Sequence, residues 1–136
     1  MRPAAVVADA NVVLSALIGG RAGLIFIDPE GPDIVGPAQV AEEVLEYLPK
    51  LAAKHKLNEG ELIAALQLLP ITWHDVSVYG HREEEARNLV EERDPEDWPV
   101  VALALELRLP IWSQDKDIEA TGLESFTTGD LLDASG

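Results

Sequence analysis

The feature that most constrains the fold is a regular alternation of short apolar segments with longer segments of helical periodicity. Residues 4–8 form an apolar run with β-branched side chains, which is typical of a buried strand, and a helical pattern begins at residue 11 directly after Asp9. Similar strand candidates recur at residues 33–36, 71–73, 110–113 and 125–127. Strands that alternate with helices predict an α/β fold with a Rossmann-like, mostly parallel sheet flanked by helices on both faces.

The intervening segments predict seven helices, several of which have recognisable ends. Asn58 opens one of them in a pattern that resembles a capping box, and Asp94 and Pro95 resemble the cap and first residue of another. Residues 100–107 are almost wholly apolar, so this second helix should be central and buried. Thr128 is the expected cap of the last helix. The expected helical segments are 11–18, 22–27, 37–54, 58–69, 82–93, 94–107 and 128–132.

Composition limits the possible function classes. The 136 residues fit a single domain spanning 1–136, and 47% hydrophobic residues are enough for a core. No apolar run approaches the roughly 20 residues of a membrane span, and no signal peptide is expected. The absence of cysteine excludes disulfides and thiolate zinc sites and fits a reducing cytoplasm, the location we expect. The net charge of −15 argues against a broad DNA-binding surface but permits a carboxylate metal site and a basic partner.

Four acidic residues occupy positions from which parallel strands could bring them together. Asp9 and Asp115 follow predicted strands, and Glu43 lies one or two turns into the helix after another strand. Asp97 lies in the first turn of the helix that precedes residue 111, and crossover helices begin at the carboxyl edge of the sheet. Ligands of such sheets bind beyond this edge, so the four carboxylates should converge there.

A convergent set of carboxylates predicts a divalent cation, because crowded acids resist ionising together and a cation removes that penalty. Magnesium prefers oxygen ligands and keeps several waters, which suits an open site. The chemistry then available is phosphodiester hydrolysis. Each acid also has a purely structural interpretation. Glu43 could be a solvated helix residue like Glu42, Asp97 could only complement a helix dipole, and Asp115 could be a loop acid.

Four segments resemble the motifs of PIN-domain (PilT N-terminus) nucleases, in order and over nearly the whole chain. They are residues 7–17, 37–45, 94–104 and 110–118. The resemblance implies a divalent metal (Mg2+ or Mn2+), cleavage of single-stranded RNA, and membership among the small toxins of toxin–antitoxin pairs. By motif position it implies the following acidic residues: Asp9, Glu43, Asp97 and Asp115, with Asp117 as an accessory ligand.

The resemblance leaves several assignments open. Glu42 competes with Glu43, because the second motif allows a slip of one residue. Ser113, where the family usually has threonine, is expected to orient a carboxylate or a water, and Asn11 and Ser15 are expected to support Asp9. The phosphate contacts available in the sequence are Arg21, Lys50, Lys54, Lys56, Arg82 and Arg108.

The main alternative keeps the fold without the activity, as a protein-interaction or RNA-binding module. Two other protein classes are disfavoured. A haloacid-dehalogenase-type phosphatase needs a second aspartate where the chain has Asn11. A phospho-receiver domain is disfavoured because its pattern does not follow residues 71–73. The expected partners are a single-stranded RNA substrate, a basic antitoxin-like protein, and a second copy of the chain. The apolar segments 12–18 and 24–27 are the expected homodimer surface.

Overall fold

A computed structural model of the chain describes residues 2–90, 95–115 and 118–134. Its centre is a five-stranded sheet with the order β3-β2-β1-β4-β5, in which every neighbouring pair is parallel. The predicted α/β fold with a parallel sheet is therefore confirmed. The strands are β1 (Ala5–Ala8), β2 (Asp33–Pro37), β3 (Ile71–His74), β4 (Ile111–Trp112) and β5 (Ser125–Phe126).

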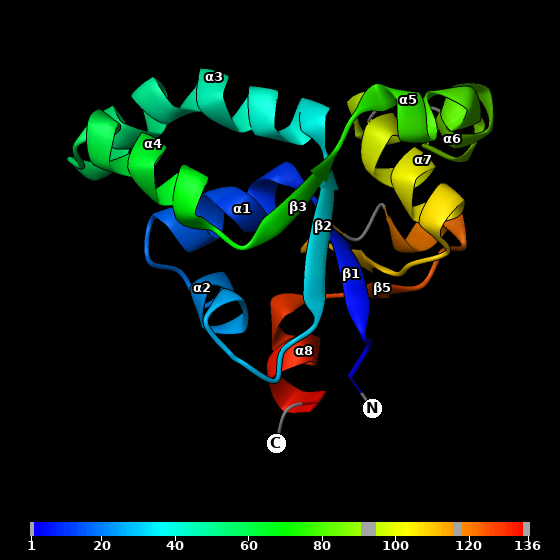
Figure 1. The fold of residues 1–136 in the computed structure, drawn as a ribbon, viewed down its shortest axis with the longest axis horizontal. Helices are drawn as coiled ribbons and strands as arrows, with labels where there is room; N and C mark the ends of the chain where they lie inside the picture. The colour runs from blue at the N-terminus through cyan, green and yellow to red at the C-terminus, as the bar shows by residue number, and fades with distance from the viewer. Residues whose placement is uncertain (1, 91–94, 116–117, 135–136) are drawn as a thin grey trace.

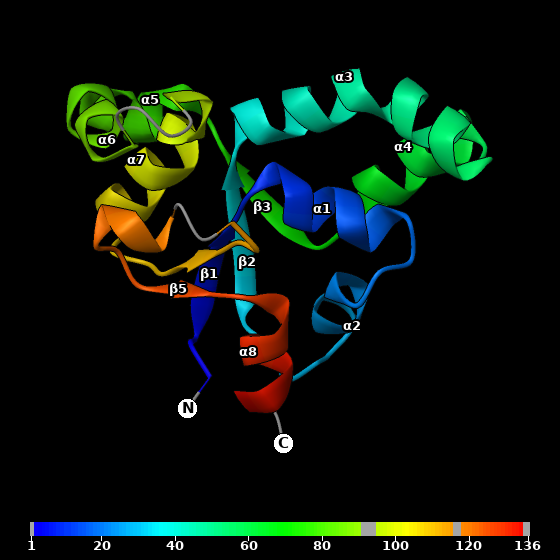
Figure 2. The ribbon, with the colours of Figure 1, turned by 180° about the vertical axis from the view of Figure 1, so that it is seen from behind.

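Helices flank this sheet on both sides. Figures 1 and 2 show α1, α2 and α4 on one side and α5, α6 and α7 on the other, while α3 runs along the top. The last helix, α8, packs against α2 and β5. The helices are α1 (Ala10–Leu17), α2 (Ala22–Phe26), α3 (Ala38–His55), α4 (Glu59–Leu68), α5 (Val76–Tyr79), α6 (Glu83–Val90), α7 (Trp98–Leu107) and α8 (Thr128–Ala134), with 3-10 turns η1 (Gly80–Arg82), η2 (Pro95–Asp97) and η3 (Glu119–Thr121).

The core lies between the central strands and the helices on each side. Val6 and Val7 of β1 and Trp112 of β4 are completely buried, as expected for strands with parallel neighbours on both edges. Helix α7 is buried from Trp98 to Ala104, which confirms the central helix that the apolar run predicted. On the other side of the sheet, Ile25 of α2 is also buried in the same core. Among the described residues, no helix is both long and apolar enough to cross a membrane.

Helix α7 begins later than the sequence predicted. The expected start at residues 94–97 is in part a 3-10 turn, Pro95–Asp97, and the α-helix begins at Trp98; Asp94 lies outside the described residues. Pro99 explains the shift. A helix starting at Pro95 would need an N–H from residue 99 to bond the carbonyl of residue 95, and proline has none. At the second position of a helix that begins at Trp98, the missing N–H is not needed.

The cap of α8 was also predicted one residue too late. Thr127 caps this helix: its Oγ1 accepts a hydrogen bond from the Asp130 N–H (3.0 Å), and the Asp130 carboxylate accepts one from the Thr127 N–H (2.9 Å). Thr128 instead turns inward, and its Oγ1 accepts a hydrogen bond of 3.0 Å from the indole Nε1 of Trp112. By contrast, the predicted cap of α4 is confirmed, because Asn58 Oδ1 accepts from the Glu61 N–H at 2.9 Å.

Candidate active site

The order of the strands reverses at β1, because β2 and β3 are added on one side of it and β4 and β5 on the other. The candidate site lies at this switch point. Strand β1 is bonded to β2, which follows it in sequence, and to β4, which comes about 100 residues later. In open parallel sheets such a switch point opens a crevice at the carboxyl ends of the two strands. Asp9 follows β1 and Ser113 follows β4, so the topology places these two polar residues side by side at the crevice.

Asp9 is held by both of its carboxylate oxygens. It is the N-cap of α1, where Oδ1 accepts a hydrogen bond of 3.0 Å from the Val12 N–H. Its Oδ2 accepts a short hydrogen bond from the Ser113 hydroxyl. Asp9 is only 7% exposed and Ser113 only 3%. The carboxylate is therefore fixed in position by two groups, one from α1 and one from the residue that follows β4.

Ser113 links Asp9 to a second acid. Its Oγ accepts a hydrogen bond of 2.9 Å from the Asp115 N–H while it donates to Asp9. The structure thus shows Ser113 orienting a carboxylate, as the sequence predicted for this position. The support expected from Ser15 was wrong, because the hydroxyl of Ser15 lies against Gly20, so close that a Cβ there would be 2.4 Å away.

Burial raises the pKa of Asp9 above its ordinary value, since the carboxylate is withdrawn from water. The hydrogen bonds from Ser113 and from the Val12 N–H favour the ionised form and oppose this rise, and the negative charge of Asp115 adds to it. Without a compensating positive charge, the ionised carboxylate is therefore held in an unfavourable environment.

A cavity of about 130 Å3 lies at this point, and five carboxylate side chains line it together with Ala10 and Asn11. These acids are Asp9, Glu43, Glu96, Asp97 and Asp115. The four acids of the predicted quartet thus meet around one cavity. They come from the end of β1, from α3, from η2 and from the loop after β4. The predicted convergence of these acids is thus seen, and their role as metal ligands stays a prediction.

The structure also shows which of several neighbouring acids line the cavity, a choice that the sequence left open. Glu43 lines the cavity, whereas Glu42 is exposed and does not, so the geometry favours Glu43. Glu96 was missed as a lining acid, although it stands directly before Asp97 in the third motif and could have been found there. Asp117 lies outside the described residues.

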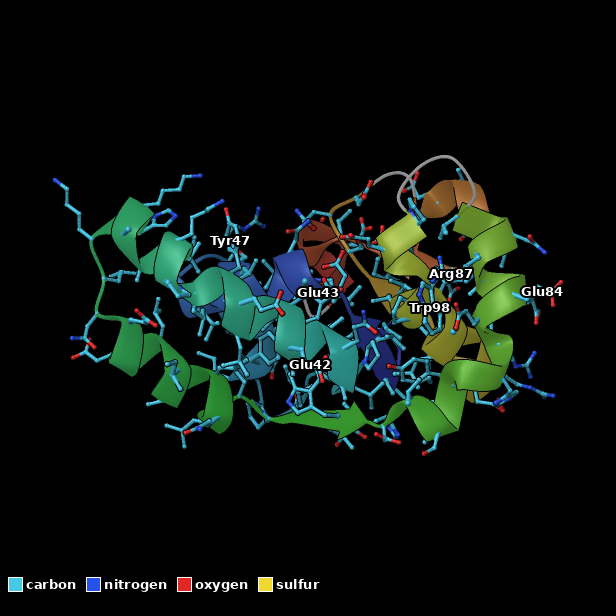
Figure 3. The ribbon with its side chains drawn as sticks, turned by 90° about the horizontal axis from the view of Figure 1, so that it is seen from above. Glu42, Glu43, Tyr47, Glu84, Arg87 and Trp98 are labelled. Carbon is cyan, nitrogen blue, oxygen red and sulfur yellow. The ribbon has the colours of Figure 1, made fainter. Side chains whose placement is uncertain are left out.

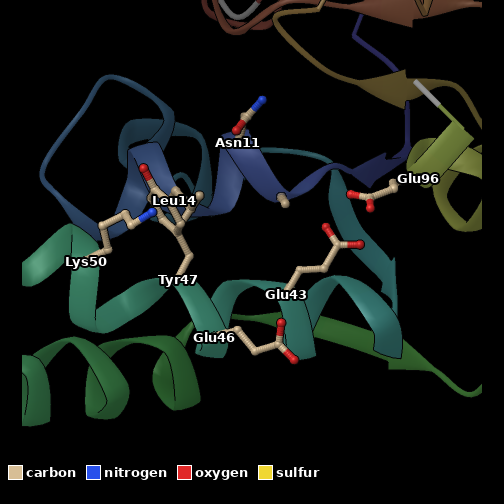
Figure 4. Close-up of a pocket in the computed structure, with 8 residues that line it drawn as sticks. Asn11, Leu14, Glu43, Glu46, Tyr47, Lys50 and Glu96 are labelled. Carbon is tan, nitrogen blue, oxygen red and sulfur yellow. The ribbon is translucent and has the colours of Figure 1, made fainter. Parts of the chain in front are cut away.

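Two larger cavities adjoin the acid cavity and share Glu43 and Glu96 with it. One, of about 570 Å3, extends along α1 and α3 past Leu14, Tyr47 and Lys50. Figure 4 shows Glu43 and Glu96 pointing toward one another at one end of this cavity and Lys50 at the other.

The other cavity, of about 390 Å3, lies on the opposite side of Glu43 and is lined by Arg87 and Trp98. Of the predicted phosphate contacts, only Lys50 lines any of these three cavities. Arg87 was missed because it belongs to a helix rich in acids, in which a single arginine gives no distinct signal.

The donor set suits a hard divalent cation in its chemistry, because the ionisable side chains that line the acid cavity are carboxylates throughout the described part of the chain. Among the described residues, no group of three or more His, Cys, Asp or Glu is arranged to hold an ion directly. The cavity of about 130 Å3 is larger than a bare ion and has room for bound waters, which Mg2+ keeps in open sites. The residues therefore fit a hydrated ion better than a closed cage.

Comparison with solved structures finds the same fold at low sequence identity. FitAcB from Neisseria gonorrhoeae has a TM-score of 0.59 and 19% identity, and the match covers 93% of this chain and 99% of that one. A structure of FitAB bound to an IR36 DNA fragment has a TM-score of 0.60 and 18% identity, over 90% of this chain and 94% of that one. A comparison with curated proteins gives no match.

The family comparison covers almost the whole described structure. The model of the PIN domain matches residues 7–134, which include the second half of β1, all of β4 and every described acid that lines the acid cavity. The parallel sheet and the acids at its switch point agree with this assignment. The chain therefore belongs to the PIN-domain family, whose members are generally nucleases.

Proposed function

We propose that the chain is a metal-dependent endoribonuclease that cleaves single-stranded RNA, and that it is the toxin of a toxin–antitoxin pair. The observation that carries the proposal is the convergence of five carboxylates on one cavity at the switch point of the sheet. A set of acids from four separate segments is difficult to explain by helix capping or by surface solubility alone. Membership of the PIN-domain family supports the nuclease class.

In this proposal Asp9, Glu43, Asp97 and Asp115 hold Mg2+ or Mn2+, with Asp117 as an accessory ligand and Glu96 at the rim. A bound divalent cation lowers the pKa of a water and stabilises negative charge on a phosphoryl group. In hydrolysis the water oxygen bonds to phosphorus, one P–O ester bond breaks, and the leaving oxygen takes up the proton that the water gives up. The hydrogen bonds from Ser113 and from the Val12 N–H keep the Asp9 carboxylate fixed before substrate arrives.

The proposed partners follow from charge and from exposed apolar side chains. A chain with a net charge of −15 attracts a basic protein, and an antitoxin with lysine- and arginine-rich segments fits this requirement. A structure with the same fold is that of FitAB bound to a DNA fragment. This neighbour supports the proposal that the chain acts together with a partner, in an assembly that contacts DNA. We also propose a homodimer. Leu24 and Ile27 of the predicted segment are 52% and 76% exposed, whereas Val12 and Val13 belong to the core.

The test of the nuclease proposal is cleavage of varied single-stranded RNAs by the purified chain with Mg2+ or Mn2+. Asp9→Asn keeps the size of the side chain and its role as a helix cap but removes one anionic ligand. It should lower the rate by several orders of magnitude while the protein stays folded. Glu43→Gln should also reduce cleavage strongly.

Matched controls separate this result from a general effect of lost charge. Glu42→Gln changes the exposed neighbour of Glu43, and Asp33→Asn changes an exposed acid at the start of β2, at the opposite end of the sheet. Both should cleave at the parent rate. Equal rates for the parent and Asp9→Asn would exclude the acid cavity as the active site. Absence of cleavage by the parent on all RNAs tested would favour the interaction-module alternative.

A further inference from the structure

The three adjoining cavities form one groove, which we define by its shared residues Glu43 and Glu96 and by its two ends. The Tyr47 end contains Lys50, and the Trp98 end contains Arg87. In the view of Figure 3, Glu43 lies between Tyr47 on one side and Arg87 on the other. Among the described residues that line the groove, two are cations, Lys50 and Arg87. The described part of the groove is therefore acidic along its length, because Glu46 lines both end cavities in addition to the central acids, and it has one cation at each end.

Each cation is positioned against an aromatic ring. Lys50 Nζ lies 5.8 Å from the ring centroid of Tyr47, and Arg87 Cζ lies 5.3 Å from that of Trp98. Rings at this distance attract a cation through their quadrupole and restrict where it can lie. Trp98 is only 8% exposed, so the ring below Arg87 is itself fixed in the core. The two positive charges thus have defined places at the ends of the groove.

Arg87 is further oriented by Glu83, whose Oε2 accepts a hydrogen bond of 2.7 Å from Arg87 Nε. This contact engages one of the five N–H donors of the guanidinium group, which binds phosphate through paired donors. The end cavities, of about 570 and 390 Å3, have the volume of ligand pockets. Each is large enough for a nucleotide-sized group.

Resting on the proposed nuclease function, we propose that Lys50 and Arg87 bind the phosphates on either side of the scissile phosphate. The RNA strand then runs along the groove from the Tyr47 end to the Trp98 end, and its central phosphate meets the cation-loaded acids. Without a bound metal the acids that line the groove would attract a cationic polypeptide, so binding of such a polypeptide is the competing outcome of the test below. The arrangement explains how a chain with a net charge of −15 can hold a polyanion: it uses two local contacts in place of a basic surface.

The experiment measures binding rather than cleavage. The full chain, with Ca2+ in place of Mg2+, is titrated with a fluorescent single-stranded RNA hexamer at several salt concentrations. Each phosphate contact contributes about 0.7 to the slope of log affinity against log salt for single strands. We expect Lys50→Gln and Arg87→Gln each to lower the slope by about 0.7, and the double variant to lower it by about 1.4.

Matched controls separate local contacts from net charge and from misfolding. Lys54→Gln removes an exposed lysine one turn after Lys50, and Arg82→Gln removes an arginine that pairs with Glu85 and Glu106; neither residue lines the groove. Both should keep the parent slope. Arg87→Lys keeps the charge and should restore the slope that Arg87→Gln loses.

The outcomes distinguish this inference from the proposed function. If the parent cleaves RNA through Asp9 but neither Lys50→Gln nor Arg87→Gln changes the slope, the strand does not follow the groove and only this inference is wrong. If the parent binds no RNA at low salt, both are wrong. If the two variants leave RNA binding unchanged and bind an oligoarginine peptide more tightly than the parent, the groove is a polypeptide site and the inference is likewise overturned.

Discussion

The two hydrogen bonds of Ser113 allow one substitution to be worked out in detail. Ser113→Ala removes a donor to the buried Asp9 carboxylate and an acceptor of the Asp115 N–H. A hydrogen bond to a charged group contributes about 1.5–3 kcal/mol and an ordinary one about 1 kcal/mol. Both residues at the Asp9–Ser113 contact are almost fully buried, so little screening by water is expected. We therefore expect a loss of about 2.5–4 kcal/mol in the free energy of unfolding at neutral pH.

The effect of Ser113→Ala should also depend on pH. The Ser113 hydrogen bond lowers the pKa of Asp9 and so favours its ionised form. Removing it raises the folded-state pKa further, and the extra loss of stability appears as pH rises through that pKa. In acid, where Asp9 is protonated, the two proteins should differ less. Urea unfolding at neutral and at acidic pH measures both quantities.

Ser113→Thr is the matched control because it keeps the hydroxyl. It should retain most of the stability that Ser113→Ala loses, minus a smaller penalty for the added methyl group in a buried position. The reasoning would be refuted by a Ser113→Ala loss below about 0.5 kcal/mol at neutral pH, the size of an ordinary surface substitution. A loss that did not change with pH would show that the hydroxyl has no special contact with the ionised carboxylate.

Three further predictions follow from described contacts. Burial raises the pKa of Asp9, so ionisation of Asp9 without metal should lower the stability of the protein as pH rises through the folded-state pKa, and Asp9→Asn should remove this dependence. Thermal unfolding in chelator and in Mn2+ should show that the metal stabilises the parent much more than the variant. Thr128→Val keeps the side-chain shape but leaves the buried Trp112 Nε1 without its acceptor, and it should cost about 1–3 kcal/mol in urea unfolding. Ile27→Ser, at the exposed residue that follows α2, should leave folding intact and weaken the proposed homodimer in sedimentation. A parent that is monomeric at all micromolar concentrations would contradict the dimer.

The sequence predicted the order and type of most elements because their signals are local. The β-branched run before Asp9 and the capping pattern at Asn58 depend on neighbouring residues only, and both are confirmed. Thr128 was assigned the wrong role because two adjacent threonines fit the same capping pattern. Which of them turns toward Trp112 depends on a contact with a strand elsewhere in the chain, and local sequence does not contain it.

The candidate site was predictable in its acids but not in its surroundings. Residues that follow parallel strands meet at one edge whatever the strand order, so Asp9 and Asp115 could be paired from the pattern alone. Arg87 could not be found this way. It reaches the groove from a helix on the far side of α7, and its position is set by packing on Trp98, which only the folded chain shows.

The long separation between the two central strands has a consequence for biosynthesis. The carboxylate of Asp9 meets its partner Ser113 across 104 residues of sequence, and β1 lacks its β4 neighbour until the later strand exists. A chain still emerging from the ribosome, or one that ends prematurely before β4, has no closed crevice, and its Asp9 lacks the hydrogen bond from Ser113. Contacts of such high sequence separation also form slowly. The acid cavity is therefore one of the last features of this protein to be completed during synthesis, and fragments that lack β4 remain without it.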